Sequence, residues 1–324
     1  MKRTTFVLLI VIVFSFVIYL TGETVQMANQ KATTPNIEKE KHTLLELDSA
    51  MSDVSEEKGL FEAFYPFLDE QSVIFPANGH PICGQNACAK LMEKVNSDKE
   101  NGKIKWYPLK VLVSLAGDIA YTNGNFERII SSTGTETKPV IHYYVTIWKK
   151  NSTGHWKIAV SQGLLFVNDL NQPPVSKQFK EANLSPTLLN VINTERAFSK
   201  YSMEQNRLGA FYNYIDDKGI AISGGTTPRF KENYSKALAD LNEKKEAVPS
   251  LPRTTLEWEP FFAYLSQSED YAFDYGPYTY TEYDATGGKK LYYGYFITVW
   301  KKQPDNSWKF IMDCGNESPT PAKK

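Results

Sequence analysis

Two short stretches that read almost alike decide the fold: Tyr144–Lys150, YVTIWKK, and Phe296–Lys302, FITVWKK. Their tryptophans lie 152 residues apart (300 − 148). The same offset pairs further Trp, Gly, Asp and Pro positions: Trp106 with Trp258, Pro108 with Pro260, Asp118 with Asp270, Gly124 with Gly276, and Trp156 with Trp308. Self-similarity at one fixed spacing is the sequence signature of a repeated structural unit. The chain of 324 residues is therefore predicted to contain two copies of one domain.

The front of each copy is related by a smaller offset, because Ala63–Tyr65 matches Ala210–Tyr212 at 147 residues (210 − 63). The second copy therefore carries a net insertion of five residues (152 − 147). We expect it within Arg229–Arg253, a segment rich in Lys and Glu.

Apolar spacing predicts the same order of elements in both copies. Helices are expected over 43–54 and 189–202, short strands over 72–75 and 219–223, and further helices over 86–95 and 229–246. A run of strands joined by hairpin turns follows in each copy. Helices grouped at one end and an antiparallel sheet at the other define an α+β fold.

The N-terminus carries a targeting pattern. Lys2 and Arg3 precede an apolar run from Phe6 to Leu20, as in a secretory signal, although an uncleaved membrane anchor over residues 4–22 also fits. We predict a secreted, periplasmic or membrane-anchored protein. The expected segments are a leader at 1–22, a flexible tether at 23–41, a first domain at 42–168, a linker at 169–185, a second domain at 186–318 and a tail at 319–324.

Composition limits the function. With 36 Lys and Arg against 37 Asp and Glu, no basic excess favours nucleic acid. Aromatic residues make up 13% of the chain, which suits either a ligand-binding surface or a strand-rich core. Cys83 and Cys88 can form a disulfide if the chain is exported. No Cys/His set with metal-ligand spacing appears, and we expect neither a metal nor a cofactor.

Each copy resembles the SnoaL-like domains of the nuclear transport factor 2-like superfamily, within an uncharacterised branch. The resemblance rests on Gly117-Asp118-Ile119-Ala120-Tyr121, the tryptophan–lysine strand quoted above and Trp156-Lys157, with their counterparts in the second copy. It implies a cone-shaped domain, with a curved antiparallel sheet wrapped around about three helices and a conical cavity between them. Members include isomerases, cyclases, dehydratases and non-catalytic binding domains, and many pair through the open face of the sheet. The two copies are therefore expected to form an internal pseudo-dimer.

The ketosteroid isomerase pattern within that superfamily needs a carboxylate base, a tyrosine and a carboxylic acid donor. By resemblance, the base position falls on Phe75 and Ile222, and the acid position on Tyr144 and Phe296. We therefore predict no catalytic residue and no convergent acid–base pair in either copy. His142, on the same strand face as Tyr144, is the alternative candidate for a histidine mechanism in the first copy.

The aromatic residues of the second copy allow two interpretations, a cavity for an apolar ligand or a packed interface between the copies. The predicted ligand-binding residues are Trp106, His142, Tyr144, Trp258, Tyr280 and Phe296. The leading hypothesis is non-catalytic binding of a small apolar ligand or a protein partner. The alternatives are an isomerase, dehydratase or cyclase that uses the first domain's cavity, and a structural or interaction module with collapsed cavities.

Overall fold

The computed structural model describes residues 35–97, 103–129, 142–163, 175–176, 178–223, 227–243, 254–284 and 286–322. The predicted leader at 1–22 lies outside these ranges. Among the helices that are described, none is both long and apolar enough to cross a membrane.

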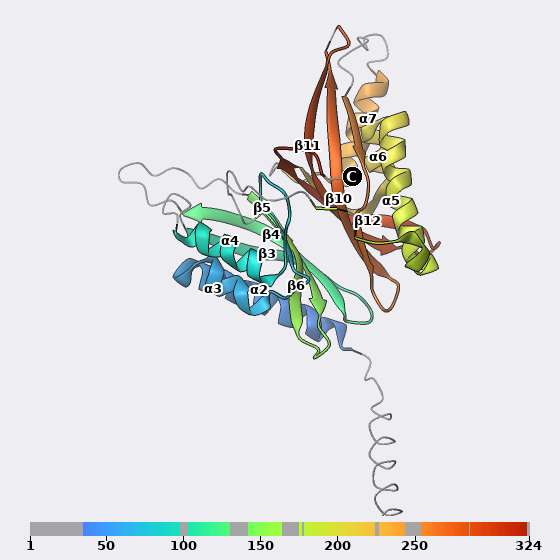
Figure 1. Ribbon diagram of the computed structural model, residues 1–324. Helices are drawn as coiled ribbons and strands as arrows, with labels where there is room; N and C mark the ends of the chain where they lie inside the picture. Colours follow the sequence, from blue (N-terminus) through green and yellow to red (C-terminus); the bar gives the residue numbers. More distant parts are fainter. Residues whose placement is uncertain are drawn as a thin grey trace, which may run out of the picture. The chain divides into compact units, whose positions relative to one another are not determined.

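The first set of elements runs from Ile37 to Gln162 (Figure 1). Its helices are α2 (Ile37–Lys58), α3 (Leu60–Phe64), the 3-10 helix η1 (Tyr65–Phe67) and α4 (Gln85–Ser97). Its strands are β1 (Val73–Phe75), β2 (Ile82–Cys83), β3 (Lys103–Val113), β4 (Ile119–Ile129), β5 (His142–Lys150) and β6 (Trp156–Gln162).

The second set repeats this order. After the 3-10 helix η3 (Glu181–Asn183), its helices are α5 (Pro186–Glu204), α6 (Arg207–Tyr214) and α7 (Lys231–Glu243). Its strands are β7 (Ile215–Ser223), β8 (Thr254–Trp258), β9 (Phe262–Leu265), β10 (Tyr271–Tyr283), β11 (Lys289–Lys302) and β12 (Trp308–Ser318).

The two sheets share one topology. The first has the strand order β2-β1-β6-β5-β4-β3, and the second has β7-β12-β11-β10-β8 with β9 also paired to β10. In each sheet the neighbours are antiparallel, except that the first strand runs parallel to the last, β1 with β6 and β7 with β12. The protein thus has the predicted α+β fold, with two curved sheets and helices against each of them (Figure 1).

Helix α2 begins inside the segment predicted to be a flexible tether. Asn36 caps it, since its side chain accepts a hydrogen bond from the Lys39 amide at 3.1 Å. Glu40 in the first turn then accepts hydrogen bonds from Lys150 Nζ at 2.6 Å and from Trp156 Nε1 at 2.9 Å. These contacts to the sheet order the turn, so the first domain starts at Ile37 and not at residue 42.

The paired glycines of the repeat occupy one close approach between strands. A Cβ on Gly124 would lie 1.9 Å from the carbonyl oxygen of Tyr107, and one on Gly276 would lie 2.0 Å from that of Glu259. The chain opposite contains the paired prolines. The ladder between β3 and β4 is irregular between Pro108 and Lys110, and Pro260 lies between β8 and β9. Both domains therefore share a close contact between neighbouring chain segments at which only glycine fits.

Each sheet has an apolar face against its own helices and another face in a third cluster. Tyr144 and Trp148 of β5 belong to the core under α2, whereas Val145 and Ile147 of the same strand belong to a cluster shared with β7, β10, β11 and β12. The Phe75 ring lies 5.4 Å from the ring of Tyr275 in this shared cluster. The alternation follows from the two-residue period of a strand.

Two turns, one from each half of the chain, are joined by a pair of equivalent hydrogen bonds. Asp118 Oδ2 accepts a hydrogen bond from the Gln267 amide at 2.9 Å, and Asp270 Oδ2 accepts one from the Leu115 amide, also at 2.9 Å. Each aspartate also bonds a serine of its own turn, Ser114 or Ser266. Asp118 and Asp270 therefore link turns of opposite halves as well as forming their own.

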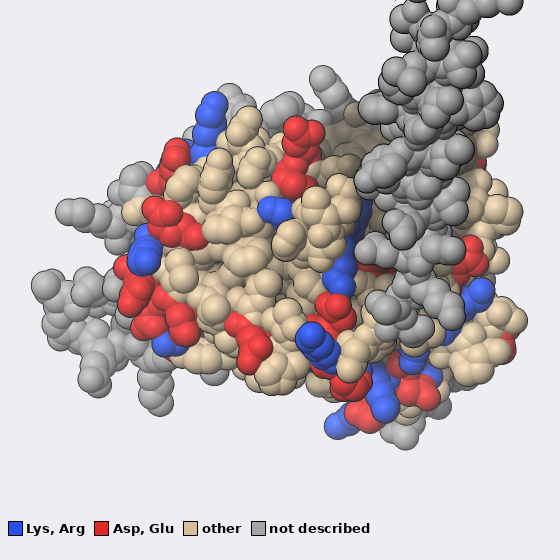
Figure 2. Space-filling model, turned by 90° about the horizontal axis from the view of Figure 1, so that it is seen from below, with Lys and Arg blue, Asp and Glu red and all other residues tan. Residues whose placement is uncertain are grey.

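None of the three cysteines of the chain is in a disulfide. Cys83, Cys88 and Cys314 are free thiols, so Cys83 and Cys88 do not form the disulfide considered above. The Cys88 thiol instead points at the carbonyl oxygen of Ile82, 3.3 Å away. On the face in Figure 2, basic and acidic side chains are interspersed without a dominant patch.

Candidate functional site

In the first domain, two predicted ligand-binding residues surround a buried acid. Asp48 of α2 is 1% exposed and accepts hydrogen bonds from Trp106 Nε1 and the Tyr144 hydroxyl, each at 2.8 Å. Burial raises the pKa of the Asp48 carboxyl, and these donors oppose the shift. Trp106 and Tyr144 are each 1% exposed as well. This arrangement is a packed polar core, so the geometry does not support these two residues as ligand contacts.

The second domain builds the same position with a longer acid. Glu195 of α5 accepts hydrogen bonds from Trp258 Nε1 and from Trp300 Nε1, the latter at 3.0 Å. In the first domain the tryptophan equivalent to Trp300, Trp148, donates to the Thr122 hydroxyl instead, also at 3.0 Å. The extra methylene of glutamate lets one carboxylate satisfy both indoles, and the position equivalent to Thr122 is therefore free for another group.

That group is a second acid, Asp274 of β10, which is fully buried beside Glu195. Neither oxygen of Asp274 has a hydrogen-bond partner among the described residues, and the Glu195 carboxyl beside it adds like charge. Two neighbouring buried carboxyls are stable together when one of them carries a proton. Burial and the Glu195 charge raise the pKa of Asp274 well above its usual value, and burial also raises that of Glu195. Since the two indoles already stabilise charge on Glu195, Asp274 holds the proton.

A third acid, Asp313, lies near this pair and lines a cavity. Asp313 of β12 takes the place of Ser161 in the first domain, and its Oδ2 accepts a hydrogen bond from the Thr298 hydroxyl at 3.1 Å. Burial, followed by the Glu195 charge, raises the pKa of Asp313 well above its usual value. Its side chain is partly accessible and lines a cavity.

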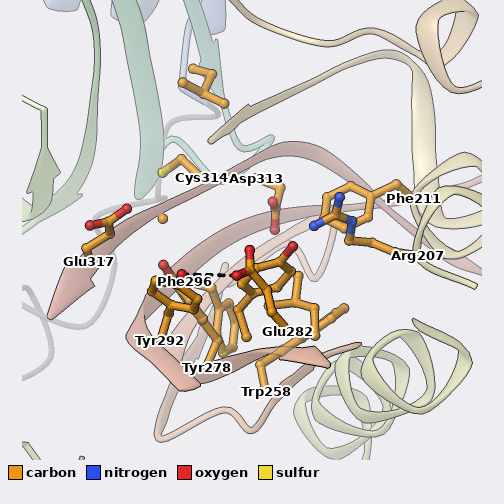
Figure 3. Close-up of a pocket in the computed structure, with 14 residues that line it drawn as sticks. Arg207, Phe211, Trp258, Tyr278, Glu282, Tyr292, Phe296, Asp313, Cys314 and Glu317 are labelled. Atoms are coloured by element: carbon orange, nitrogen blue, oxygen red, sulfur yellow. Dashed lines mark hydrogen bonds between the residues drawn. The ribbon is translucent and has the colours of Figure 1, made fainter. Parts of the chain in front are cut away.

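This cavity, of about 410 Å³, lies between the helix-facing side of the second sheet and α6 (Figure 3). Strand alternation turns the even-numbered residues of β10 and β11 toward it. Three predicted ligand-binding residues line it, Trp258, Tyr280 and Phe296. Phe211, Tyr278 and Tyr292 add further rings, and the charged lining residues are Arg207, Glu282, Asp313 and Glu317.

Charged side chains reach the cavity from different walls. Figure 3 shows the Asp313 carboxyl and the Arg207 guanidinium pointing into it from β12 and from α6. The Arg207 guanidinium carbon lies 5.6 Å from the Tyr280 ring centroid, and Glu282 accepts a hydrogen bond from the Tyr292 hydroxyl at 3.0 Å. The second domain thus gathers one basic and three acidic side chains around its cavity, and the absence of a convergent acid–base pair stays a prediction.

The remaining predicted residue, His142, does not line this cavity. It stacks on Phe126 with 5.0 Å between ring centroids and lines an adjoining cavity of about 560 Å³, which shares Ile222, Tyr278 and Glu317 with the first. The two base-equivalent positions, Phe75 and Ile222, both belong to the shared apolar cluster, and Ile222 also lines the 410 Å³ cavity.

The aromatic residues of the second domain lie in two different environments. Tyr271, Phe273 and Tyr275 belong to the shared apolar cluster, whereas Tyr278 and Tyr280, farther along the same strand, line the cavity. Sequence reasoning missed Asp274, Asp313 and Arg207. The available signal was the repeat itself, which aligns Asp274 with Thr122 and Asp313 with Ser161. Within the described chain no group of three or more His, Cys, Asp or Glu residues has an arrangement that could hold a metal ion.

Comparison with known proteins gives structural likenesses only. No protein-family model matches the sequence, and no curated protein is similar to it. A ketosteroid isomerase-like protein from Erwinia carotovora atroseptica is 16% identical, with 41% of this chain and 98% of that chain covered and a TM-score of 0.32. A nuclear transport factor 2-like superfamily protein from Salmonella enterica is 12% identical, with 41% and 92% covered and a TM-score of 0.32. A nuclear transport factor 2-like protein from Novosphingobium aromaticivorans is 7% identical, with 40% and 80% covered and the same score.

Proposed function

We propose that the second domain binds a small, largely apolar molecule in the 410 Å³ cavity. The observation that carries the proposal is the ring of six aromatic side chains around it, contributed by α6, β8, β10 and β11. Ligand sites in proteins are typically about 300–1,000 Å³ in volume and are lined mostly by apolar groups with a few polar ones. In the first domain, Trp106 and Tyr144 pack against a buried acid, so we assign that domain a structural role.

The test uses the full chain and a neutral fluorescent probe, N-phenyl-1-naphthylamine, whose emission rises in apolar surroundings. The variant Leu256→Trp places bulk on the cavity wall, and Leu109→Trp is the control, since Leu109 is 66% exposed on the first domain. We expect saturable binding that Leu256→Trp weakens at least about tenfold and Leu109→Trp leaves unchanged. Equal binding by all three proteins would contradict the proposal. Mass spectrometry of small molecules that co-purify with the native protein identifies the natural ligand.

A catalytic function of isomerase, dehydratase or cyclase type is the second candidate, and one observation moves it to the second domain. Asp313, with a raised pKa, lines the second cavity, whereas Ser161 occupies its place in the first. An acid of raised pKa suits proton transfer near neutral pH. Conversion of a co-purified molecule, lost in Asp313→Asn, supports catalysis. Recovery of the molecule unchanged supports binding alone.

We also propose that the chain is exported or held at a membrane by its N-terminal segment, and that its two domains form an internal pseudo-dimer. The apolar run from Phe6 to Leu20 supports the first statement. The shared apolar cluster and the matching bonds of Asp118 and Asp270 support the second. Cell fractionation of the full-length protein tests the first, and sedimentation at increasing concentration tests whether the chain remains a monomer.

A further inference from the structure

The second cavity carries more negative than positive charge. Its charged lining residues are two acids, Glu282 and Glu317, and one base, Arg207. Asp313 adds a carboxyl whose raised pKa keeps its proton until a cation beside it favours the ionised form. Behind Asp313 lies the Glu195–Asp274 pair, which carries further negative charge. An anionic ligand in this cavity would lie close to these acids and be repelled by them.

The aromatic walls also favour a positively charged ligand. The rings of Tyr280 and Tyr292 lie 5.9 Å apart with a 42° tilt, and those of Trp258 and Phe296 lie 6.3 Å apart with a 59° tilt. Aromatic faces attract cations through their quadrupole, and tilted rings around one space are the usual means of holding a quaternary ammonium. The Arg207 guanidinium over Tyr280 shows that this wall already accepts a cation.

From these observations we infer that the ligand of the second cavity is an organic cation, a compact aromatic or alkyl molecule that carries an ammonium group. The inference rests on the proposed binding function and specifies the class of its ligand. The ammonium lies against the aromatic faces with Glu282 as its counter-charge and with Asp313 beside it, where the cation favours the ionised carboxyl. The apolar part fills the space near Phe211 and Phe296. A metal ion fits poorly, because much of the lining is aromatic and no metal-binding group occurs among the described residues.

The repeat provides an internal comparison. Where the second domain has Asp313 and Tyr278, the first has Ser161 and Phe126 at the same offset of 152 residues (313 − 161 and 278 − 126). The first domain lacks the extra acid at this position, so we assign the cation preference to the second domain alone.

The experiment compares three probes of similar size that differ in charge. Phenyltrimethylammonium is the cation, tert-butylbenzene is its neutral isostere and benzenesulfonate is the anion. Each competes with N-phenyl-1-naphthylamine for the full chain at neutral pH. We expect the cation to displace the dye at a concentration about tenfold lower than the neutral probe, since a desolvated cation–π contact with counter-charges is worth this much. Benzenesulfonate should be the weakest of the three.

Two variants and one control locate the effect. Glu282→Gln removes a negative charge from the cavity, and Asp313→Asn removes a carboxyl that a bound ammonium would ionise. Both variants preserve side-chain size. The control is Glu127→Gln, because Glu127 accepts a hydrogen bond from the Tyr107 hydroxyl at 2.7 Å and so matches the Glu282–Tyr292 pair on the first domain. We expect each cavity variant to weaken cation binding about three- to tenfold and to change tert-butylbenzene binding less than about twofold. If Asp313→Asn does not fold, Glu282→Gln, nearer the surface, still decides the question.

The outcomes separate the two proposals. Preference for benzenesulfonate or tert-butylbenzene overturns the cation inference and leaves the binding function standing. A cation preference that survives both cavity variants also overturns it, because the acids would then play no part. If the dye itself does not bind in this cavity, the binding function fails and the inference fails with it.

Discussion

At the scale of single residues, the two domains differ most in their buried acids. The first holds Asp48 under two neutral donors, and the second holds Glu195 against Asp274, with Asp313 nearby. Buried ionisable groups that must share protons make stability depend on pH. Each domain can therefore be perturbed separately by changing one carboxyl.

We predict that Asp274→Asn reduces the loss of stability at alkaline pH. The folded-state pKa values of Glu195 and Asp274 are raised, so their contribution is fully present below the unfolded pKa and is lost as the pH rises through the folded pKa. An asparagine amide donates to Glu195 without needing a proton. In urea unfolding, the difference between pH 5 and pH 8 should shrink by on the order of 2 kcal/mol. Asp240→Asn, on the exposed face of α7, is the control and should behave as the unmodified protein.

The second prediction concerns Asp48→Ala. The substitution leaves the indole N–H of Trp106 and the hydroxyl of Tyr144 without their acceptor in a buried core. We expect a loss of about 3 kcal/mol in the free energy of unfolding. Asp53→Ala, at an exposed position of the same helix, should change it by less than about 0.5 kcal/mol. Dye binding by the second domain should be unchanged, and its loss would argue against separate roles for the two domains.

At the scale of secondary-structure elements, the repeat predicts much of the fold. The offset of 152 residues aligned the strands, because Trp106 and Trp258, and Trp148 and Trp300, occupy equivalent core positions. Helix α2 begins earlier than predicted because the Asn36 cap and the contacts of Glu40 to β5 and β6 extend it, and those partners lie over a hundred residues away in sequence. Long-range contacts of this kind leave no local pattern.

The site was less predictable than the fold. Alternation along β10 separated Tyr278 from Tyr275, but it does not tell which face borders open space and which is packed. That depends on how far α6 lies from the sheet, and on side chains such as Phe296. The sequence predicts Trp106 and Tyr144 as ligand contacts, yet Asp48 draws both of them into hydrogen bonds in the core.

The third prediction concerns the paired glycines. Gly124→Ala and Gly276→Ala each place a carbon within about 2 Å of a carbonyl oxygen on the neighbouring chain, so the backbone must move. We expect both to cost about 2–4 kcal/mol in the free energy of unfolding. Gly79→Ala is the comparison, because its added carbon meets only the Pro76 ring at 3.1 Å, and it should cost less. Equal losses at all three positions would mean that the close approach is unimportant.

At the scale of the whole molecule, the matching bonds of Asp118 and Asp270 connect the halves at two turns. We predict that Asp118→Ala combined with Asp270→Ala loosens the domain contact without unfolding either domain. The aspartates bond backbone amides of the opposite turn, whereas the cores under α2 and α5 do not include them. Amide hydrogen exchange should quicken at 115–118 and 266–270 and stay slow in β5 and β11. Faster exchange throughout both sheets would contradict this.

The parallel pairing of the first and last strands also bears on the order in which the chain is made. β1 cannot join its sheet until β6 exists, and β7 waits in the same way for β12, which lies between it and β11. On the ribosome, the first domain has all its strands only once Gln162 has emerged, and it can then close while the second is still being synthesised. A nascent chain stopped before Trp308 would carry one finished domain followed by β7 without a strand partner and β11 with one unpaired edge. The last strand of the second domain to be synthesised is thus also the one that brings Asp313 to its cavity.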